Sequence, residues 1–493
     1  QSVNVTYQGD KLTSGQQCYW KVRVWDASGK VSDWSDAAKF TIGLLNSDDW
    51  KGEWILKEDQ KKTDHNWYRK NFKLSEEPES ALVYVASFGY HELYVNGKKV
   101  GDEVINPVSS FMKKRIPYLT YDIKKLLKKS DNVIAVWHAA GWARWNRVTE
   151  YMNPPFVFKA QAEIQTDNQK ITLSTDTSWK CKKSYSSYYG DWDILDFGGE
   201  IIDERLREDD WNTVNYDDSD WMQADIYDPD VLNAKIKGNN ITITRNSNYK
   251  RSIIREYGNI SATLSAQMVE PQVKYREITP VGVKKNDDGT YRIDMGENYT
   301  GYFEMNLFNG HEGDTVTFEI ADREVVTSTW KQKSKYIYDK TGEGHFTNRF
   351  NVAGGRWITV YGLNYKPALK DIKGYVITND RKRISSFESS DTLLNQIYET
   401  NLKTYIANTM DGILVDCPHR ERRGWGEVTV AAMYGDAFPN YESGAYMDQY
   451  SQYMRDAQFN DGRIRAVINE QDRPFLMWKA NCPLTIWETY WTY

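Results

Sequence analysis

The stretch Ser390-Asp391-Thr392-Leu393-Leu394-Asn395-Gln396-Ile397-Tyr398 marks the point where the sequence changes from strand-like to helix-like patterning. Ser390 and Asp391 form a helix-start signal, with the serine as the cap and the acid in the first turn. Apolar side chains then recur at helical spacing, at Leu394, Ile397, Tyr398, Leu402, Tyr405 and Ile406. Residues 430–454 and 476–493 have the same character. We therefore predict an all-helical part over residues 383–493.

The beginning of the chain has the pattern of β-strands. In residues 18–25 the side chains of Cys18, Trp20, Val22 and Val24 fall on one face, which is typical of a half-buried strand. Residues 26–29 supply a turn, and residues 31–42 have the pattern of another strand. We expect the end of a small β-module over residues 1–43, followed by a linker.

The long middle of the chain also favours strands. Residues 81–88 and 133–137 are apolar and β-rich, and Asn96-Gly97 is set for a type I′ turn between two strands. This predicts a jelly-roll-like β-sandwich region over residues 44–260. Residues 316–320 alternate cleanly, residues 293–301 are expected between strands, and residues 357–362 read as a strand and turn. They predict a second β-sandwich over residues 261–382.

Composition excludes several classes of protein. The 493-residue chain has a formal net charge of −6 and no basic stripe, so nucleic acid is not an expected partner. No apolar run is long enough to cross a bilayer. The four cysteines are scattered without a CxxC pair, and the six histidines show no HExxH. We expect no zinc site, no disulfide framework and no catalytic transition metal.

Aromatic residues are unusually common, at 14% of the chain with 19 Trp and 34 Tyr. Wet aromatic surfaces are typical of carbohydrate recognition, but the same residues also fill β-sandwich cores. Three acidic and aromatic phrases, at residues 178–179, 197–205 and 216–221, allow the same two interpretations. They could serve a sugar or a calcium ion, or be turns between strands.

The most informative motif is DCPHRERRGWGE at residues 416–427. It places three carboxylates, three arginines, a histidine and a tryptophan in one segment, at the loop and first turn between two predicted helices. Carboxylates can transfer protons, arginine can bind hydroxyl groups, and an indole offers an apolar face to a sugar ring. A solvated loop rich in ion pairs is the alternative.

At this point the chain resembles the bacterial α-L-rhamnosidases of glycoside hydrolase family 78. The resemblance runs in order through a fibronectin type III-like end, the phrases ELYVNGKKVG, FGGEIIDERL and DMGENYTGY, and finally DCPHRERRGWGE. It implies that the helical part is the start of an (α/α)6 barrel. It also implies an inverting glycoside hydrolase that removes terminal α-L-rhamnose.

The resemblance assigns roles within the motif. Glu421 matches the general acid, Asp416 and Arg420 match positions that bind sugar hydroxyls, and Trp425 matches the aromatic wall. If this segment is helical, Glu421 and Trp425 share a face, and the indole could help desolvate the carboxyl group.

The sequence departs from the family pattern in two places. The longer family motif has one more residue before its acid, and that register would place Arg422 there; a guanidinium cannot serve as the acid, and the shorter family form keeps Glu421. The longer form also has an aspartate where this chain has Val428, and Glu427 is the candidate to replace it.

The general base is expected beyond residue 493. Glu470 and Glu488 are better explained as structural or solvated helix carboxylates. Both ends of the chain look cut, and barrel helices without their neighbours would expose apolar faces. We therefore expect the isolated chain to be inactive or poorly folded in its last segment.

The expected partner is a rhamnose-containing oligosaccharide, polysaccharide or glycoside. No cofactor is expected to be required; calcium in an auxiliary sandwich is left open, and no residue marks its site. A periplasmic or extracellular location is expected, with a cytoplasmic one left open because the natural N-terminus is missing. Two alternatives remain: an (α/α)6 glycosidase for a different sugar, or a non-catalytic carbohydrate-binding protein.

Overall fold

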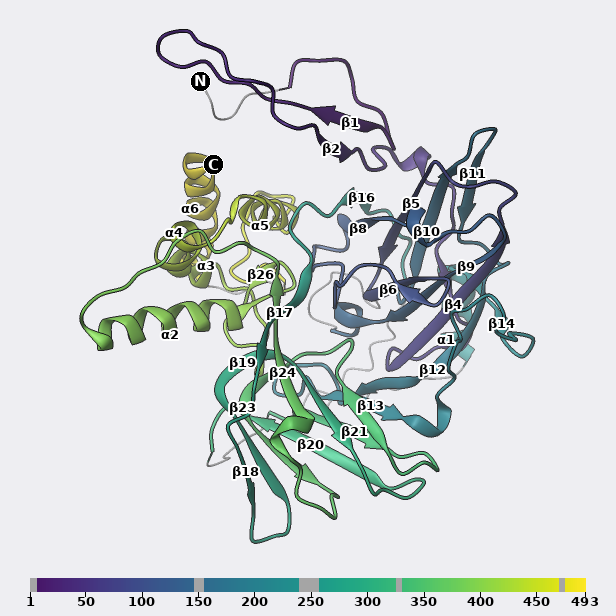
Figure 1. Cartoon of the computed structure of the whole chain (residues 1–493), viewed down its shortest axis with the longest axis vertical. Coiled ribbons are helices and arrows are strands. Elements are labelled where there is room, and N and C mark those ends of the chain that lie inside the picture. The colour runs from purple at the N-terminus through teal and green to yellow at the C-terminus, as the bar shows by residue number, and fades with distance from the viewer. Residues whose placement is uncertain (1–6, 146–154, 239–256, 325–329, 470–474) are drawn as a thin grey trace.

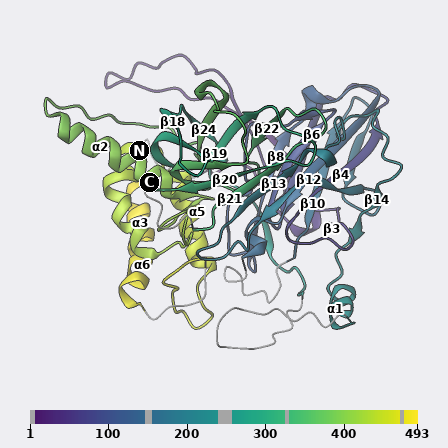
Figure 2. The same cartoon turned by 90° about the horizontal axis from the view of Figure 1, so that it is seen from below.

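The computed structural model describes residues 7–145, 155–238, 257–324, 330–469 and 475–493. Figure 1 shows a body built of β-sheets, with helices α2 to α6 (within residues 392–492) gathered on one side, α1 (Pro229–Gly238) on the other, and the N-terminal segment above. Figure 2, seen from below, shows the helices standing beside the sheets rather than between them. The change from strands to helices thus follows the order predicted from the sequence.

The N-terminal segment is less regular than its pattern predicts. β1 (Gln17–Trp20) pairs antiparallel with β2 (Ala38–Thr41). The half-buried strand expected over residues 18–25 is wrong, because Trp20, Val22 and Val24 are 51%, 50% and 65% exposed. Beyond Trp20 the backbone N–H groups of Val22 and Val24 donate to serine hydroxyls instead of a strand. Within the described residues no second sheet covers this face.

A seven-stranded sheet forms one layer of the first sandwich, in the order β15-β3-β10-β5-β8-β16, with β11 on β10. Its strands are β3 (Ile55–Leu56), β5 (Ser80–Ser87), β8 (Arg115–Asp122), β10 (Phe158–Gln165), β11 (Lys170–Ser174), β15 (Asp225–Ile226) and β16 (Thr263–Ala266). β16 lies beyond the expected boundary at residue 260 but pairs in parallel with β8, so this sheet extends past that boundary.

A fifteen-stranded sheet runs through both sandwich regions, in the order β17-β24-β19-β23-β20-β21-β13-β12-β4-β9-β6-β7, with β14, β18 and β22 at its sides. Its first-region strands are β4 (Asp64–Lys73), β6 (Tyr90–Val95), β7 (Lys98–Lys99), β9 (Asp131–Ala139), β12 (Lys180–Tyr189), β13 (Gly199–Asp203) and β14 (Met222–Gln223). The others are β17 (Gln272–Ile278), β18 (Gly282–Lys285), β19 (Tyr291–Leu307), β20 (Thr315–Ala321), β21 (Lys333–Ile337), β22 (Gly344–Thr347), β23 (Ala353–Tyr361) and β24 (Ile372–Asn379). The parallel pair β13–β21 joins the two regions.

Local turn and strand signals are confirmed where they are strong. Asn96 and Gly97 have φ values of +50° and +85°, as a type I′ turn between β6 and β7 requires. β9 is buried along almost its whole length, and β20 alternates as predicted. Residues 293–301 do not lie between strands, however. They belong to β19, which pairs on through a bulge between Asp294 and Tyr299.

Several hydrophobic cores hold the sheets together. Val83 and Phe158 from the smaller sheet pack with Val136 and Cys181 from the larger one inside the first sandwich. A separate core fills the second region and is closed by apolar side chains of the first helix after it, including Leu402. This second core therefore fixes the start of the helical part against the sheet.

The helices are α1 (Pro229–Gly238), α2 (Thr392–Asn408), α3 (Gly426–Ala432), α4 (Phe438–Asn440), α5 (Gly444–Asp456) and α6 (Leu476–Thr492). The cap of α2 is Asp391 rather than Ser390, because the Asp391 side chain accepts the Leu393 N–H at 2.8 Å. The single helical stretch expected over residues 430–454 is broken by a π-turn at Met433–Ala437 and by an extended residue at Tyr441. None of the helices in the described ranges has the length and apolarity to cross a membrane.

Candidate functional site

The motif at residues 416–425 lies between the short hairpin β25 (Thr409–Met410)–β26 (Ile413–Leu414) and the start of α3. Its backbone is a compact turn: the carbonyl of Cys417 accepts N–H groups from Arg420, Glu421 and Arg422 at 3.3, 3.1 and 3.1 Å. Arg422 has a φ of +49°. The condition under which Glu421 and Trp425 would share a helical face is therefore not met, because the positive φ between them interrupts any helix.

Arg422 anchors this turn to the second sandwich region. It is 1% exposed and donates to the carbonyls of Pro418 and Val352, both at 2.8 Å, and to Asn351 Oδ1 at 3.1 Å. Its guanidinium carbon lies 4.3 Å from the ring centroid of Phe197. Burial lowers the pKa of Arg422 to about 10. The Arg422 side chain is fully occupied by structural contacts. The alignment with the longer family motif, which would place the acid at this position, is therefore not supported.

Glu421 lies at the N–H edge of the Trp425 indole. The Trp425 Nε1–H donates to Glu421 Oε1 at 2.8 Å, so the two residues meet as expected, although through a turn. Arg423 Nη1 is 3.3 Å from the other carboxylate oxygen. Glu421 as a whole is 8% exposed. The carboxyl group is thus held in one orientation with a small opening to solvent.

The electrostatic surroundings of Glu421 favour a retained proton. Burial raises the pKa of this carboxyl group above its ordinary value, and the neighbouring carboxylate of Asp416 raises it further. The indole N–H of Trp425 and the charge of Arg423 act in the opposite direction but do not prevail. Burial and a neighbouring carboxylate both disfavour the charged form of a carboxyl group, which is why its pKa is raised here.

Asp416 and Arg420 form the open edge of the site. Arg420 Nη2 lies 3.1 Å from Asp416 Oδ2, and the two side chains are 43% and 39% exposed. Arg420 Nη2 is also 3.8 Å from Glu421 Oε2. The structure therefore brings the predicted residues Asp416, Arg420, Glu421 and Trp425 together in one cluster. This edge offers both hydrogen-bond donors and acceptors to a polar ligand.

Trp425 is partly taken up by packing. Its ring centroid lies 5.9 Å from that of Phe475 and 6.4 Å from that of Trp478, which come from the start of α6. The backbone of Glu427 belongs to the first turn of α3, but its side chain is outside the described part of the structure, as is Glu470 as a whole. Glu488, on α6, accepts a hydrogen bond from the Tyr434 hydroxyl and so raises the pKa of that phenol.

Asp411 is an anchor that the sequence analysis missed. It is 0% exposed, and its carboxylate accepts hydrogen bonds from the Tyr90 hydroxyl at 2.8 Å, Trp142 Nε1 at 2.9 Å and Gln272 Nε2 at 2.6 Å. Burial raises its pKa to about 6. The Asp411-Gly412 pair before an apolar run was a readable turn signal, but its partners are distant in sequence.

The acidic side chains described next, from residues 197–205 and 216–221 of the first sandwich, bind other groups of the protein. Glu200 accepts the backbone N–H groups of Arg349 and Phe350, both at 2.8 Å, and burial raises its pKa to about 7. Asp218 lies 2.9 Å from both Arg69 and Lys180. The largest aromatic cluster is likewise internal, and its tryptophans Trp67, Trp137, Trp211 and Trp221 are all buried. For these tryptophans the sandwich-core interpretation is confirmed, whereas Glu200 lies within strand β13 and not in the turn considered for it.

Asp416, Cys417 and Glu421 place possible metal-ligand atoms within 4.8 Å of one another, the one such group of three in the described ranges. Burial raises the pKa of the Cys417 thiol to about 12, which disfavours the thiolate that metals bind. The oxygens of Glu421 already face an indole N–H and two arginines. These donors suit a hydrogen-bonded carboxyl group better than a metal ligand.

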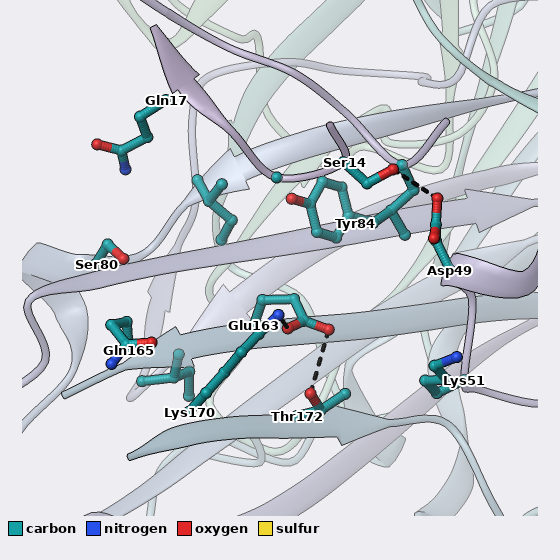
Figure 3. A pocket seen from close by; sticks show the side chains of 14 residues that line it. Ser14, Gln17, Asp49, Lys51, Ser80, Tyr84, Glu163, Gln165, Lys170 and Thr172 are labelled. Carbon is teal, nitrogen blue, oxygen red and sulfur yellow. Dashed lines mark hydrogen bonds and ion pairs between the residues drawn. The ribbon is translucent and has the colours of Figure 1, made fainter. Parts of the chain in front are cut away.

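A cavity of about 460 Å³ lies away from the motif, between the N-terminal segment and the smaller sheet. Figure 3 shows polar side chains around it, among them Gln17, Glu163 and Lys170. Glu163 is bound by Lys170 at 2.7 Å and by the Thr172 hydroxyl at 3.2 Å. The charge of the Glu163 carboxylate is therefore paired within the protein.

Comparison with known proteins matches most of this architecture to domains of one family. Models of bacterial α-L-rhamnosidase domains match residues 76–245 (the N-terminal domain), 284–378 (the concanavalin-like domain) and 382–493 (the six-hairpin glycosidase domain). The chain belongs to the bacterial α-L-rhamnosidase family. A Rha78A-like N-terminal immunoglobulin model matches residues 1–46, so the segment expected to be fibronectin-like is of immunoglobulin type.

Individual relatives agree with this assignment. An α-L-rhamnosidase of Formosa agariphila is 27% identical over 92% of this chain and 48% of its own length. One of an Alteromonas species is 27% identical over 96% of this chain and 50% of its own length. The chain therefore spans about half the length of the curated relatives it matches.

Solved structures of the family have the same fold. An α-L-rhamnosidase from Dictyoglomus thermophilum superposes with a TM-score of 0.85 at 25% identity, over 99% of this chain and 54% of that one. One from Aspergillus terreus superposes with a TM-score of 0.79 at 22% identity, over 95% and 53% of the two chains. The order of sheets and helices described above is thus that of the family.

Proposed function

We propose that this chain carries the acid side of the active site of an inverting α-L-rhamnosidase, with Glu421 as the general acid. The observation that carries the proposal is the buried Glu421 carboxyl group, with its raised pKa, beside Asp416 and hydrogen-bonded by the Trp425 indole N–H. Family membership and relatives named α-L-rhamnosidase support rhamnose as the sugar.

In the proposed reaction Glu421 donates its proton to the glycosidic oxygen as the bond to rhamnose breaks. The exposed pair Asp416 and Arg420 binds hydroxyl groups of the sugar, since one side chain accepts and the other donates hydrogen bonds. Trp425 orients Glu421 through its indole N–H and offers the remaining part of its ring to the sugar. An inverting mechanism then needs a second carboxylate about 6.5–9.5 Å from the acid to activate water.

We also propose that α2 to α6 begin the (α/α)6 barrel of the family. The six-hairpin model that matches residues 382–493 supports this, as does the position of the motif between the β25–β26 hairpin and α3. The reaction needs no metal at this site, because Glu421 can supply the proton and the arginines can stabilise the carboxylates. Glycosides with terminal α-L-rhamnose, in oligosaccharides or polysaccharides, are the proposed substrates.

The test is hydrolysis by the full-length protein of a panel of p-nitrophenyl glycosides. Release from the α-L-rhamnoside, with none from the α-L-fucoside or the β-D-glucoside, supports the proposal. Cleavage of another glycoside with none of the rhamnoside would mean a glycosidase for a different sugar. Binding of L-rhamnose without cleavage of any substrate would mean a carbohydrate-binding protein.

Glu421→Gln should lower the rate of rhamnoside hydrolysis by about 100-fold or more, with little change in fold. Glu399→Gln is the matched control, because Glu399 is an exposed helix glutamate paired with Arg383 at 2.8 Å. Equal activity of the two variants would remove Glu421 from the proposed role. Circular dichroism and the unfolding midpoint establish that both variants are folded.

A further inference from the structure

A turn from the first sandwich lies directly against the motif. The connection at residues 190–198 leaves β12 and leads to β13. Within it, Asp193 and Asp196 exchange backbone hydrogen bonds of 2.9 and 2.8 Å, so Ile194 and Leu195 are the two central residues of a tight turn. The Leu195 N–H donates to the carbonyl of Arg420 at 2.8 Å. The turn and the motif, 225 residues apart in sequence (420 − 195), are thus joined at the residue next to Glu421.

The turn is held firmly on both sides of Leu195. Trp192 is 1% exposed, and its ring centroid lies 5.2 Å from the guanidinium carbon of Arg422. Phe197 is 0% exposed and packs on the same guanidinium at 4.3 Å. The Trp192 Nε1–H also donates to Asn351, which binds Arg422 as well. The backbone of the turn therefore has a fixed position relative to the motif.

The backbone conformation at Leu195 is energetically unfavourable for a leucine. Its φ is +66°, the left-handed value that the third residue of a type II turn requires and that glycine or asparagine adopts most easily. Its side chain is 47% exposed, so burial does not offset the backbone strain. A strained backbone at an exposed apolar residue, beside a candidate active site, calls for a functional explanation.

We infer that Leu195 contacts the leaving group of the glycoside and favours apolar or aromatic leaving groups. The inference rests on the proposed function, in which Glu421 protonates the leaving-group oxygen. Arg420, to which Leu195 is bound, precedes Glu421, and its guanidinium lies 3.8 Å from the Glu421 carboxylate. The exposed apolar side chain of Leu195, on a backbone bonded to the residue before Glu421, is therefore the one we assign to the leaving group as a specificity-determining residue.

The experiment compares wild type and Leu195→Asn in the full-length protein. The substrates are p-nitrophenyl α-L-rhamnoside and an α-L-rhamnosyl-glucose disaccharide, which share the sugar but differ in the leaving group. Asparagine tolerates the left-handed backbone and removes the apolar side chain. Leu206→Asn is the matched control, because Leu206 is a 57% exposed leucine of the same sandwich region.

Leu195→Asn is expected to lower kcat/KM for the aryl rhamnoside by about tenfold and for the disaccharide by less than about twofold. Its unfolding midpoint should equal or exceed that of wild type, since strain is relieved. Equal losses on both substrates, or a lowered midpoint, would overturn the inference while leaving the proposed function in place. A wild type that cleaves neither substrate would overturn the proposed function and this inference with it. Leu206→Asn should behave as wild type on both substrates.

Discussion

The pKa of Glu421 is set by neighbours that act in opposite directions. Burial and the carboxylate of Asp416 raise it, whereas the indole N–H of Trp425 and the charge of Arg423 lower it. A general acid must be protonated to act, so activity is lost as pH rises through this pKa. The alkaline limb of the pH profile therefore reports the balance among these side chains.

Two substitutions should move that limb in opposite directions. Trp425→Phe removes the hydrogen bond that stabilises the charged carboxylate, so the alkaline limb of kcat/KM should move up by about one pH unit. Asp416→Asn removes a neighbouring negative charge, so the limb should move down. The measurement is the pH dependence of kcat/KM for one α-L-rhamnoside. Parallel shifts of the two variants, or none, would mean that Glu421 is not the titrating acid.

The composition of this site was readable from sequence, but its geometry was not. Asp416, Arg420, Glu421 and Trp425 are close in sequence, and the prediction that they form one cluster is confirmed. The turn that brings them together depends on Arg422, whose partners Asn351 and Val352 lie about seventy residues earlier. A local pattern carries no information about such distant contacts, so it could not predict the shape of this turn.

At the scale of elements, the β25–β26 hairpin is fastened by Asp411 to three other parts of the chain. Tyr90 lies on β6, Trp142 follows β9, and Gln272 begins β17, and all three donate to its carboxylate. Asp411 has a φ of +52° at the turn of the hairpin. The motif begins at Asp416, just after this hairpin. Asp411 therefore helps, together with Arg422, to fix the position of the motif.

Asp411→Ala should lower the free energy of unfolding by about 3 kcal/mol, because it leaves three buried donors without an acceptor. Tyr90→Phe removes one of these donors and should cost about 1 kcal/mol. Chemical denaturation followed by tryptophan fluorescence measures both. If Asp411→Ala cost no more than Tyr90→Phe, the anchoring role of Asp411 would be contradicted.

Elements were predictable where local signals decide them. The turn at Asn96 and Gly97 needs two residues with positive φ, and asparagine followed by glycine is the pair that favours this conformation. The half-buried strand predicted from Cys18, Trp20, Val22 and Val24 was wrong, because burial requires a covering layer. Periodicity in the sequence cannot show whether such a layer is present. The motif inside β19 was taken for a loop because a bulge between Asp294 and Tyr299 interrupts its alternation but not its pairing.

At the scale of the whole molecule, a buried ion pair joins the two sandwich regions. Glu92 on β6 is 5% exposed and binds Arg349, which lies between β22 and β23, and Lys99 at 3.3 Å. Burial acts to raise the pKa of Glu92, but the charges of Arg349 and Lys99 outweigh it and lower the pKa to about 2. The Arg349 guanidinium also lies 4.0 Å from the ring centroid of Trp137.

This ion pair should make stability depend on pH in a defined window. The pKa of Glu92 is lower in the folded chain than in the unfolded one, so its contribution is present above about pH 4.5. It is lost as pH falls toward 2. The contribution is about 3 kcal/mol at neutral pH. In Glu92→Gln the unfolding midpoint should fall less steeply between pH 5 and 3 than in wild type, measured by thermal scans across this range. Identical slopes would contradict the assignment.

The central claim, that Glu421 protonates the leaving group of an α-L-rhamnoside, is tested most directly by varying the need for that proton. Wild type and Glu421→Gln are compared on methyl α-L-rhamnoside and 2,4-dinitrophenyl α-L-rhamnoside, whose leaving groups differ greatly in acidity. We predict that the variant loses about 1,000-fold or more in kcat/KM on the methyl rhamnoside. On the dinitrophenyl rhamnoside, whose leaving group departs without a proton, the loss should be less than about tenfold. Equal losses on the two substrates would contradict the claim.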